Sequence, residues 1–180
     1  MRDALLDAGF EALVEEGPDF GAASVARRSG ASKALVFHHF GTREGLLDAM
    51  AARVLSQTQE GLTRLAEDYP DGRARLDALA RTLLEEPRDI TPKEARHVMA
   101  FWLLTDATGS CRGALRDALI ADFVGNDRIA QLLLSRWHGT TVLYASGRAV
   151  DFEREQERLV EELAAERAHL LPPGRHGGRS

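Results

Sequence analysis

The residues best suited to chemistry lie in a short basic segment from Gly21 to Arg43. It contains four bases and no Asp or Glu, although the whole chain has a net charge of −5; the bases are Arg27, Arg28, Lys33 and Arg43. Clustered cations can bind phosphate groups, because counterions released from a nucleic acid supply most of its sequence-independent affinity. The charges alone are equally compatible with a solvated basic helical face.

Two short helices joined by a glycine turn would position this segment. Gly30 can adopt the left-handed backbone that ends a helix, and Ser32 can cap the next helix through its hydroxyl. Apolar residues recur at helical spacing on both sides of the turn, namely Val25, Ala26, Val36, Phe37 and Phe40. This is the helix-turn-helix pattern, in which the first residues of the second helix face base edges in the major groove of DNA.

The rest of the chain predicts an all-α fold of about nine helices, because we find no alternating strand pattern. Apolar residues at helical spacing and Gly, Pro or capping residues at the ends place the other helices at 2–16, 42–68, 71–87, 91–108, 110–125, 126–147 and 151–171. Thr91, Pro92 and Glu94 form a strong helix start, with a cap, a proline at the first position and an acid three residues after the cap.

Composition excludes several other classes of protein. No apolar run is long enough to span a membrane, and Met1 is followed at once by charged Arg2 and Asp3, so we expect neither a membrane segment nor a secretory signal. The single cysteine, Cys111, cannot form an intrachain disulfide. These features together indicate a cytoplasmic protein. We expect no metal site, because the adjacent His38 and His39 point to different helix faces.

The basic segment and its flanks resemble the TetR family of transcriptional regulators. The resemblance covers about Leu5 to Met50 and depends on Gly30–Lys33, Val36–Phe40, Thr42–Glu44 and Leu46–Leu47. By similarity, Lys33, Phe37, His38, Thr42 and Arg43 contact DNA, and Ser32, Ala34 and Leu35 form the leading edge of the recognition helix. The chain departs from the family by having Phe37 where tyrosine is usual and Gly21 where Ser or Thr commonly caps a helix.

The resemblance also implies a domain organisation. It predicts a helix-turn-helix DNA-binding domain at 1–48, a helical ligand-binding and dimerisation domain at 49–171 and a disordered tail at 172–180. Family members are homodimers whose last two helices pair with their copies. A symmetric dimer would place two recognition helices about 34 Å apart and would bind a palindromic operator in double-stranded DNA.

A pocket for a mostly apolar small molecule is suggested by aromatic and polar residues on two helices. Met99, Trp102, Thr105 and Asp106 share one side of the helix expected at 91–108, and Trp137, Thr141 and Tyr144 share a face of the helix at 126–147. Core packing would explain the aromatics equally well. Asp106 distinguishes the two, because a buried acid needs a partner: Arg112, Arg116 or a cationic ligand group. Among these we expect Arg112.

The dimer interface is predicted on the last two helices. Gly139 permits close backbone approach, and the apolar residues expected beside it at the interface are Leu132, Leu143, Leu159 and Leu163. The alternative is that these leucines belong to the core of one chain.

Taken together, the sequence predicts a homodimeric, ligand-responsive DNA-binding regulator, most simply a repressor. One alternative is a helical dimer that binds a small molecule or protein without affinity for DNA. An enzyme built on a helical bundle is a weaker alternative, because we find no phosphate-binding loop, no Gly-x-Ser-x-Gly elbow, no zinc pair and no C-x-x-C motif. We therefore expect neither catalysis nor a cofactor.

Overall fold

The computed structural model describes residues 1–85, 90–107 and 112–170, and these residues form nine helices. They include no β-strand, which confirms the all-α prediction. The helices are α1 (Arg2–Glu16), α2 (Ala22–Ser29), α3 (Lys33–Phe40), α4 (Arg43–Asp68), α5 (Gly72–Glu85), α6 (Pro92–Ala107), α7 (Arg112–Val124), α8 (Asp127–Ala145) and α9 (Phe152–Leu170). The predicted tail at 172–180 lies outside the described residues.

Most described helix ends lie within two residues of the positions that the sequence marked, and the predicted ends at 87, 108, 110 and 171 lie outside the described residues. Gly30 ends α2 with a left-handed backbone at φ 67°, which a side chain with a Cβ rarely adopts. At the start of α6, the Thr91 hydroxyl accepts from the Glu94 backbone N–H at 3.3 Å, and a Glu94 carboxylate oxygen accepts from the Thr91 N–H at 2.6 Å. This reciprocal pair is the predicted capping box.

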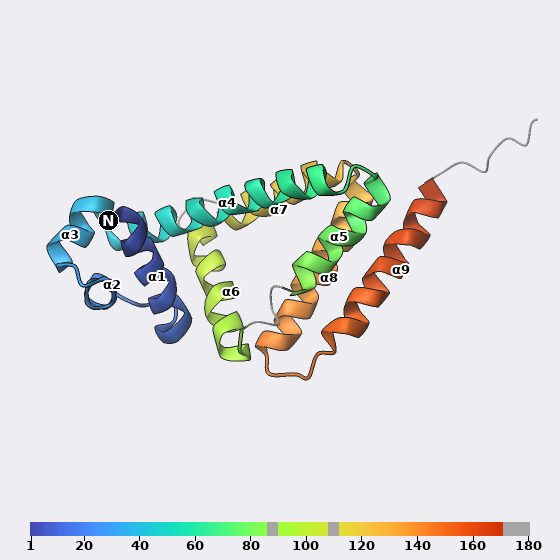
Figure 1. Cartoon of the computed structure of the whole chain (residues 1–180). Coiled ribbons are helices and arrows are strands. Elements are labelled where there is room, and N and C mark those ends of the chain that lie inside the picture. The colour runs from blue at the N-terminus through green and yellow to red at the C-terminus, as the bar shows by residue number, and fades with distance from the viewer. Residues whose placement is uncertain (86–89, 108–111, 171–180) are drawn as a thin grey trace, which may run out of the picture.

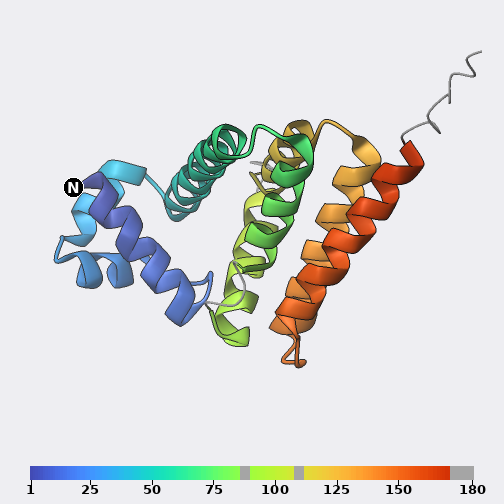
Figure 2. The same ribbon diagram turned by 45° about the vertical axis from the view of Figure 1, so that its right-hand side comes forward.

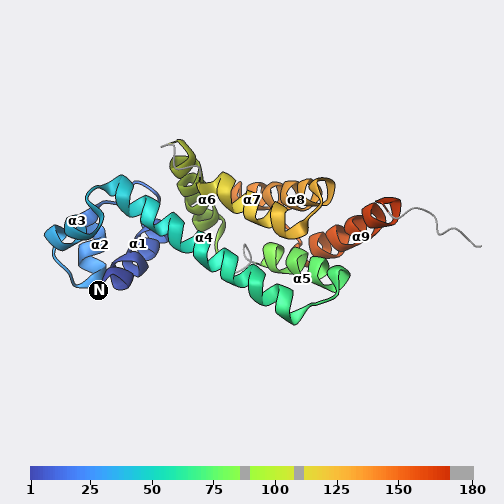
Figure 3. The same cartoon turned by 90° about the horizontal axis from the view of Figure 1, so that it is seen from above.

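The nine helices form two groups joined by the long helix α4. Figure 1 shows α1, α2 and α3 at one end of the molecule, and α4 running from this end along the body. Helix α6 lies beside α1, and α7 packs along α4. At the other end α8 and α9 run side by side, with α5 against both of them (Figure 2). Seen from above in Figure 3, α6, α7 and α8 lie on one side of α4.

Two hydrophobic cores hold these groups together. The N-terminal core buries one face of each of α1 to α3 and the start of α4, and includes Leu5, Val25, Val36 and Met50. Phe101 of α6, only 1% exposed, completes this core from outside the predicted DNA-binding domain. The second core packs α5, α7, α8 and α9 around the end of α4. Helix α6 therefore belongs structurally to the N-terminal domain as well as to the body.

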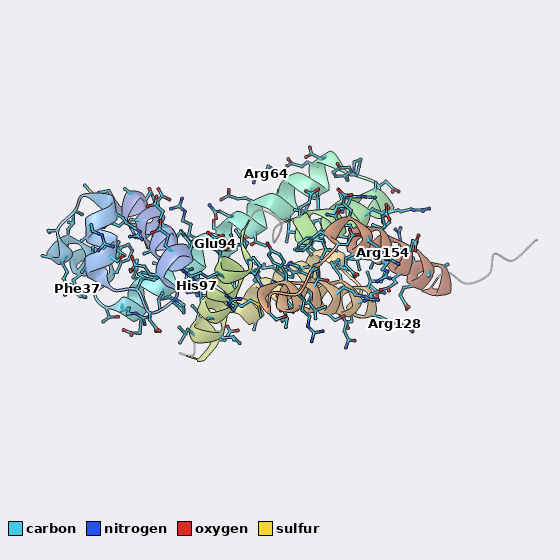
Figure 4. All side chains as sticks on the ribbon, turned by 90° about the horizontal axis from the view of Figure 1, so that it is seen from below. Phe37, Arg64, Glu94, His97, Arg128 and Arg154 are labelled. Carbon is cyan, nitrogen blue, oxygen red and sulfur yellow. The ribbon has the colours of Figure 1, made fainter. Side chains whose placement is uncertain are left out.

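Polar contacts fasten α6 to the end of α1. The His97 Nδ1 lies 2.8 Å from the Val14 carbonyl oxygen, and the Lys93 ammonium donates to the Glu15 carbonyl at 3.2 Å. Figure 4 shows His97 at the place where α6 meets the N-terminal domain. These carbonyls belong to the last turn of α1, where no intrahelical donors remain. The contacts fix the orientation of the N-terminal domain relative to α6.

We expect Phe101→Ala to destabilise the N-terminal domain, although Phe101 lies far along the chain from it. Loss of a fully buried phenylalanine side chain costs about 3 to 5 kcal/mol. Urea unfolding should show a decrease of this size in the free energy of unfolding. Leu103→Ala is a control on the same helix, because Leu103 is 68% exposed and its loss should change that free energy by less than about 0.5 kcal/mol. Equal effects of both substitutions would contradict the shared core.

Candidate nucleic-acid interface and internal cavity

The recognition helix α3 is held by one buried residue and two caps. Val36 is 2% exposed and anchors the helix in the N-terminal core. The Ser32 hydroxyl accepts from the Leu35 N–H at 3.1 Å, as predicted, and the Thr42 hydroxyl caps α4 by accepting from the Gly45 N–H at 3.0 Å. The predicted DNA-contact residues Ser32 and Thr42 thus cap the start of α3 and the start of α4, which follows it.

The opposite face of α3 points away from the body and is exposed. Lys33, Ala34, Phe37 and His38 lie on it, and Leu35 is half-buried at its edge. Lys33 and Phe37 are one helical turn apart, with the ammonium nitrogen 5.8 Å from the ring centroid. Figure 4 shows Phe37 at the extreme end of the molecule, remote from α6. An exposed face of this kind on a capped helix can enter a major groove.

Tertiary contacts neutralise two bases of the basic segment. The Arg27 guanidinium lies 3.2 Å from a Glu16 oxygen, and Arg28 pairs with Glu16 at 3.0 Å and with Glu15. Both acids belong to α1, which lies outside the basic segment. Fewer than the four bases of the segment are therefore available to phosphate, because α1 packs beside α2 and its acids pair with two of them.

Arg43 is engaged within the protein and does not extend toward a groove. Its Nε donates to the Phe20 carbonyl at 3.2 Å, and its terminal nitrogen donates to the Pro18 carbonyl and lies 3.8 Å from an Asp19 oxygen. These contacts hold the loop between α1 and α2. Arg43 was predicted to contact DNA, and the structure instead gives it a structural role.

Lys33 and Arg2, which was not predicted, place cations beside α3. Among the described residues, no carboxylate lies within ion-pair distance of Lys33. Arg2, at the start of α1, places its guanidinium carbon 5.5 Å from the Phe40 ring centroid at the end of α3. No local pattern marks Arg2, because the contact joins residues 38 positions apart.

The Glu16 carboxylate is the centre of the charge network between α1 and α2. The Ser24 hydroxyl donates to it, and the Arg28 and Arg27 guanidinium groups lie beside it. The hydrogen bond from Ser24, and then the charges of Arg28 and Arg27, lower the pKa of Glu16 below its ordinary value of 4.5. The folded protein therefore prefers the ionised form of Glu16.

A cavity of about 550 Å³ lies between α6, α7 and α8, where the sequence predicted a pocket. Five of the predicted residues line it: Met99, Trp102, Asp106, Trp137 and Thr141. Two do not. The Thr105 hydroxyl donates to the Trp102 carbonyl within α6, and the Tyr144 hydroxyl donates to the Ile90 carbonyl while its ring packs on Phe152.

The predicted partner of Asp106 was wrong. Arg112 turns the other way and forms a two-pronged ion pair with Asp48 of α4, with N–O distances of 3.0 and 3.2 Å. This pairing raises the pKa of Arg112. Asp106 instead accepts from the backbone N–H of Gly113 at 2.9 Å, in the first turn of α7. The first turn of α7 therefore touches both the cavity wall and α4.

An arginine held between two tryptophans was not predicted. The Arg116 guanidinium carbon lies 4.5 Å from the Trp102 ring centroid and 4.4 Å from that of Trp137, which places the cation against both rings. Arg116, Asp117 and His138 also line the cavity. Their contribution depends on three helices meeting, so no spacing within one helix could have indicated it.

The predicted dimer residues divide into two sets. Leu159 and Leu163 of α9 are 1% and 0% exposed and belong to the second core, so the intrachain alternative holds for them and they offer no surface to a second copy. On α8, Leu132 is half-buried, Leu143 is 45% exposed, and Gly139 is exposed with no atom within 4 Å of where a Cβ would lie. Only the α8 residues remain candidates for an interface.

Two kinds of feature are absent from the described residues. No group of His, Cys, Asp and Glu side chains is arranged so that it could hold a metal ion. None of the described helices combines the length and the apolar character needed to cross a membrane.

Residues 5–50 match the model of the family described as bacterial regulatory proteins, tetR family. The chain is 33% identical over 104 residues to the HTH-type transcriptional regulator BetI of Klebsiella pneumoniae, covering 56% of this chain and 53% of that protein. Its identity to BetI of Escherichia coli is 32% over the same length. The chain thus aligns with about half the length of the curated relatives that it matches.

Solved structures resemble the whole chain. A TetR-family transcriptional regulator from Streptomyces coelicolor superposes with a TM-score of 0.62 at 23% identity, covering 94% of this chain and 99% of that one. A transcriptional regulator from Aquifex aeolicus superposes with the same TM-score at 14% identity, covering 92% and 98%. At these identities the likeness establishes the fold, including the helices beyond the family match.

We expect Glu16→Gln to destabilise the protein at neutral pH and to have little effect in acid. A carboxylate whose pKa is lowered by folding stabilises the fold above the pKa of the unfolded chain, near 4.5, and this stabilisation is lost as the pH falls through the lower pKa of the folded state. Thermal unfolding of both proteins from pH 7 to pH 3 should show the difference in melting temperature shrinking below about pH 4.5. Glu11→Gln, at an exposed position on the same helix, is the control, and a difference independent of pH would contradict the assignment.

Proposed function

Because the chain belongs to the tetR family of bacterial regulatory proteins, we propose that it is a transcriptional regulator that binds double-stranded DNA through α3. It acts as a homodimer on a palindromic operator, and as a repressor. A small, mostly apolar molecule in the cavity changes its affinity for the operator. The observation that carries the proposal is the exposed outer face of α3, capped at its start by Ser32 and bearing Lys33.

The proposed DNA contacts follow from which side chains remain available. Lys33 and His38 face phosphate or base edges, and Ala34, Leu35 and Phe37 offer apolar contact to thymine methyl groups. Ser32 caps α3 and Thr42 caps α4, and their hydroxyls lie on either side of α3 along the chain. Arg2 joins this set as a phosphate contact, and Arg43 leaves it because its donors are bound within the protein.

The proposed response to a ligand uses the first turn of α7. This turn holds the cavity residue Asp106 through Gly113 and holds α4 through the Arg112–Asp48 ion pair. Helix α4 begins directly after α3, so a shift of this turn reaches the recognition helix. A coupling free energy on the order of 1 to 3 kcal/mol between effector and DNA is typical of such linked sites.

A second candidate function is a helical dimer that binds a small molecule without affinity for DNA. The neutralised bases favour it, because Arg27 and Arg28 are paired with acids of α1 and Arg43 is bound to backbone carbonyls. Gel shifts with DNA from immediately upstream of the gene, against unrelated DNA of equal length, separate the two functions. Specific retention with a steep salt dependence supports the regulator, and its absence at low salt supports the second function.

Lys33→Gln should weaken operator binding and reduce its dependence on salt. Loss of one phosphate contact lowers the slope of log K against log salt concentration by about 0.9. Fluorescence anisotropy of labelled operator between 50 and 200 mM salt measures this slope. Arg64→Gln is the matched control, because it removes one charge from an exposed position on α4 that Figure 4 shows far from α3. Equal slopes for all three proteins would show that Lys33 does not contact phosphate.

Leu143→Glu should convert the dimer to monomers, because a charge at this exposed apolar position of α8 would be buried without a partner at the interface. Sedimentation velocity on the full chain at micromolar concentration measures the change in mass. Leu115→Glu is the control: Leu115 is 46% exposed on α7, against 45% for Leu143, and lies outside the proposed interface. If Leu143→Glu sediments as the unaltered protein does, the dimer interface lies elsewhere.

A further inference from the structure

We propose that the cavity between α6, α7 and α8 selects an organic monocation, with an apolar body and one positively charged nitrogen placed beside Asp106. The inference rests on the proposed function, which makes this cavity the effector site, and it adds the chemical class of the effector. Three features support it: the net charge of the cavity wall, the accessibility of its charged side chains to a ligand, and the surroundings of Asp106.

The ionisable residues in the wall carry a net negative charge. Asp106, Arg116, Asp117 and His138 are its titratable members. Two carboxylates against one guanidinium give a formal charge of −1 when histidine is counted as uncharged, and the His138 Nε2 lies 3.5 Å from an Asp117 oxygen. The rest of the lining is mainly apolar, with Met99, Leu103 and Val142 among its members. An apolar wall strengthens the field of this charge, because apolar side chains screen charge less than water does.

Arg116 is poorly placed to receive an anion. Trp102 and Trp137 lie against its guanidinium, and the side chain is only 11% exposed. Its Nε lies 3.9 Å from an Asp117 oxygen, and the Asp117 side chain is 30% exposed. The carboxylate is thus the more accessible member of this pair. A ligand entering the cavity therefore meets more negative than positive charge.

Asp106 is a carboxylate with room for a cation. Its Oδ1 accepts from the Gly113 N–H, and no Lys or Arg of the described residues lies within ion-pair distance, since Arg112 pairs with Asp48. A Cβ at position 113 would lie 2.7 Å from Oδ2, so glycine at this position keeps the second oxygen clear. One hydrogen bond compensates the charge of a carboxylate in an apolar wall only partly, and a ligand cation would complete the compensation.

The tryptophans of the chain allow occupancy of the cavity to be measured directly. The sequence contains two, Trp102 and Trp137, and both line the cavity. Intrinsic tryptophan fluorescence of the full chain therefore reports binding there without DNA. Three probes with the same benzyl body and heads of similar shape separate charge from size: benzyltrimethylammonium, its uncharged carbon analogue neopentylbenzene, and benzylsulfonate.

The expected result is that benzyltrimethylammonium binds at least about tenfold more tightly than neopentylbenzene, and that benzylsulfonate binds more weakly than either. Asp106→Asn should remove most of the preference for the cation and leave the affinity for neopentylbenzene unchanged. Its amide oxygen can still accept from the Gly113 N–H, so the fold should survive, and thermal unfolding verifies this. Asp122→Asn removes the same charge from an exposed position on α7 outside the cavity and should keep the preference.

Several results would overturn the inference. Tighter binding of benzylsulfonate would make the effector an anion held by Arg116, and equal affinities would make charge irrelevant. A preference for the cation that survives Asp106→Asn would place the cation elsewhere, and no saturable binding of any probe would remove the site. Gel shifts without probe test DNA binding separately. Loss of DNA binding with the preference for the cation intact would refute the regulator and leave the cation site standing.

Discussion

The structure depends on the burial of Phe101, which joins α6 to the N-terminal core while α6 also packs against α7 and α8. Helix α6 inserts this ring into the N-terminal core, while its neighbour Trp102 packs against the same core and also lines the cavity. Close-packed protein interiors do not deform smoothly, so a movement of α6 would change the packing both in the N-terminal core and at the cavity. The contacts of His97 and Lys93 with the end of α1 add a polar fastening at the same junction.

The charged residues of the N-terminal domain fall into two groups: those paired between α1 and α2, and those exposed beside α3. The acids of α1 pair with Arg27 and Arg28 and so stabilise the packing of α1 against α2. Lys33 and Arg2 remain beside the recognition helix. A protein with a net charge of −5 and few available cations should depend on precise docking of α3 rather than on general attraction to phosphate.

The first turn of α7 connects the two proposed activities at the level of single hydrogen bonds. Gly113 binds the carboxylate of Asp106 in the cavity wall, and the preceding residue, Arg112, binds Asp48 on α4. A ligand cation that draws Asp106 away would act on a turn that also holds α4. The same few residues therefore relate the chemistry of the cavity to the position of the recognition helix.

The sequence by itself determined the helices, the turn and caps around α3, and five residues of the cavity wall. These features depend on neighbours within about four residues, such as the Ser32 cap, the left-handed Gly30, and the helical spacing of Met99, Trp102 and Asp106. The tertiary structure alone determined which charged residues pair with each other and which face of α9 is buried. Arg28 meets Glu15, Arg112 meets Asp48 across 64 positions, and Leu159 faces the core, because such contacts depend on how helices pack and no local spacing encodes them.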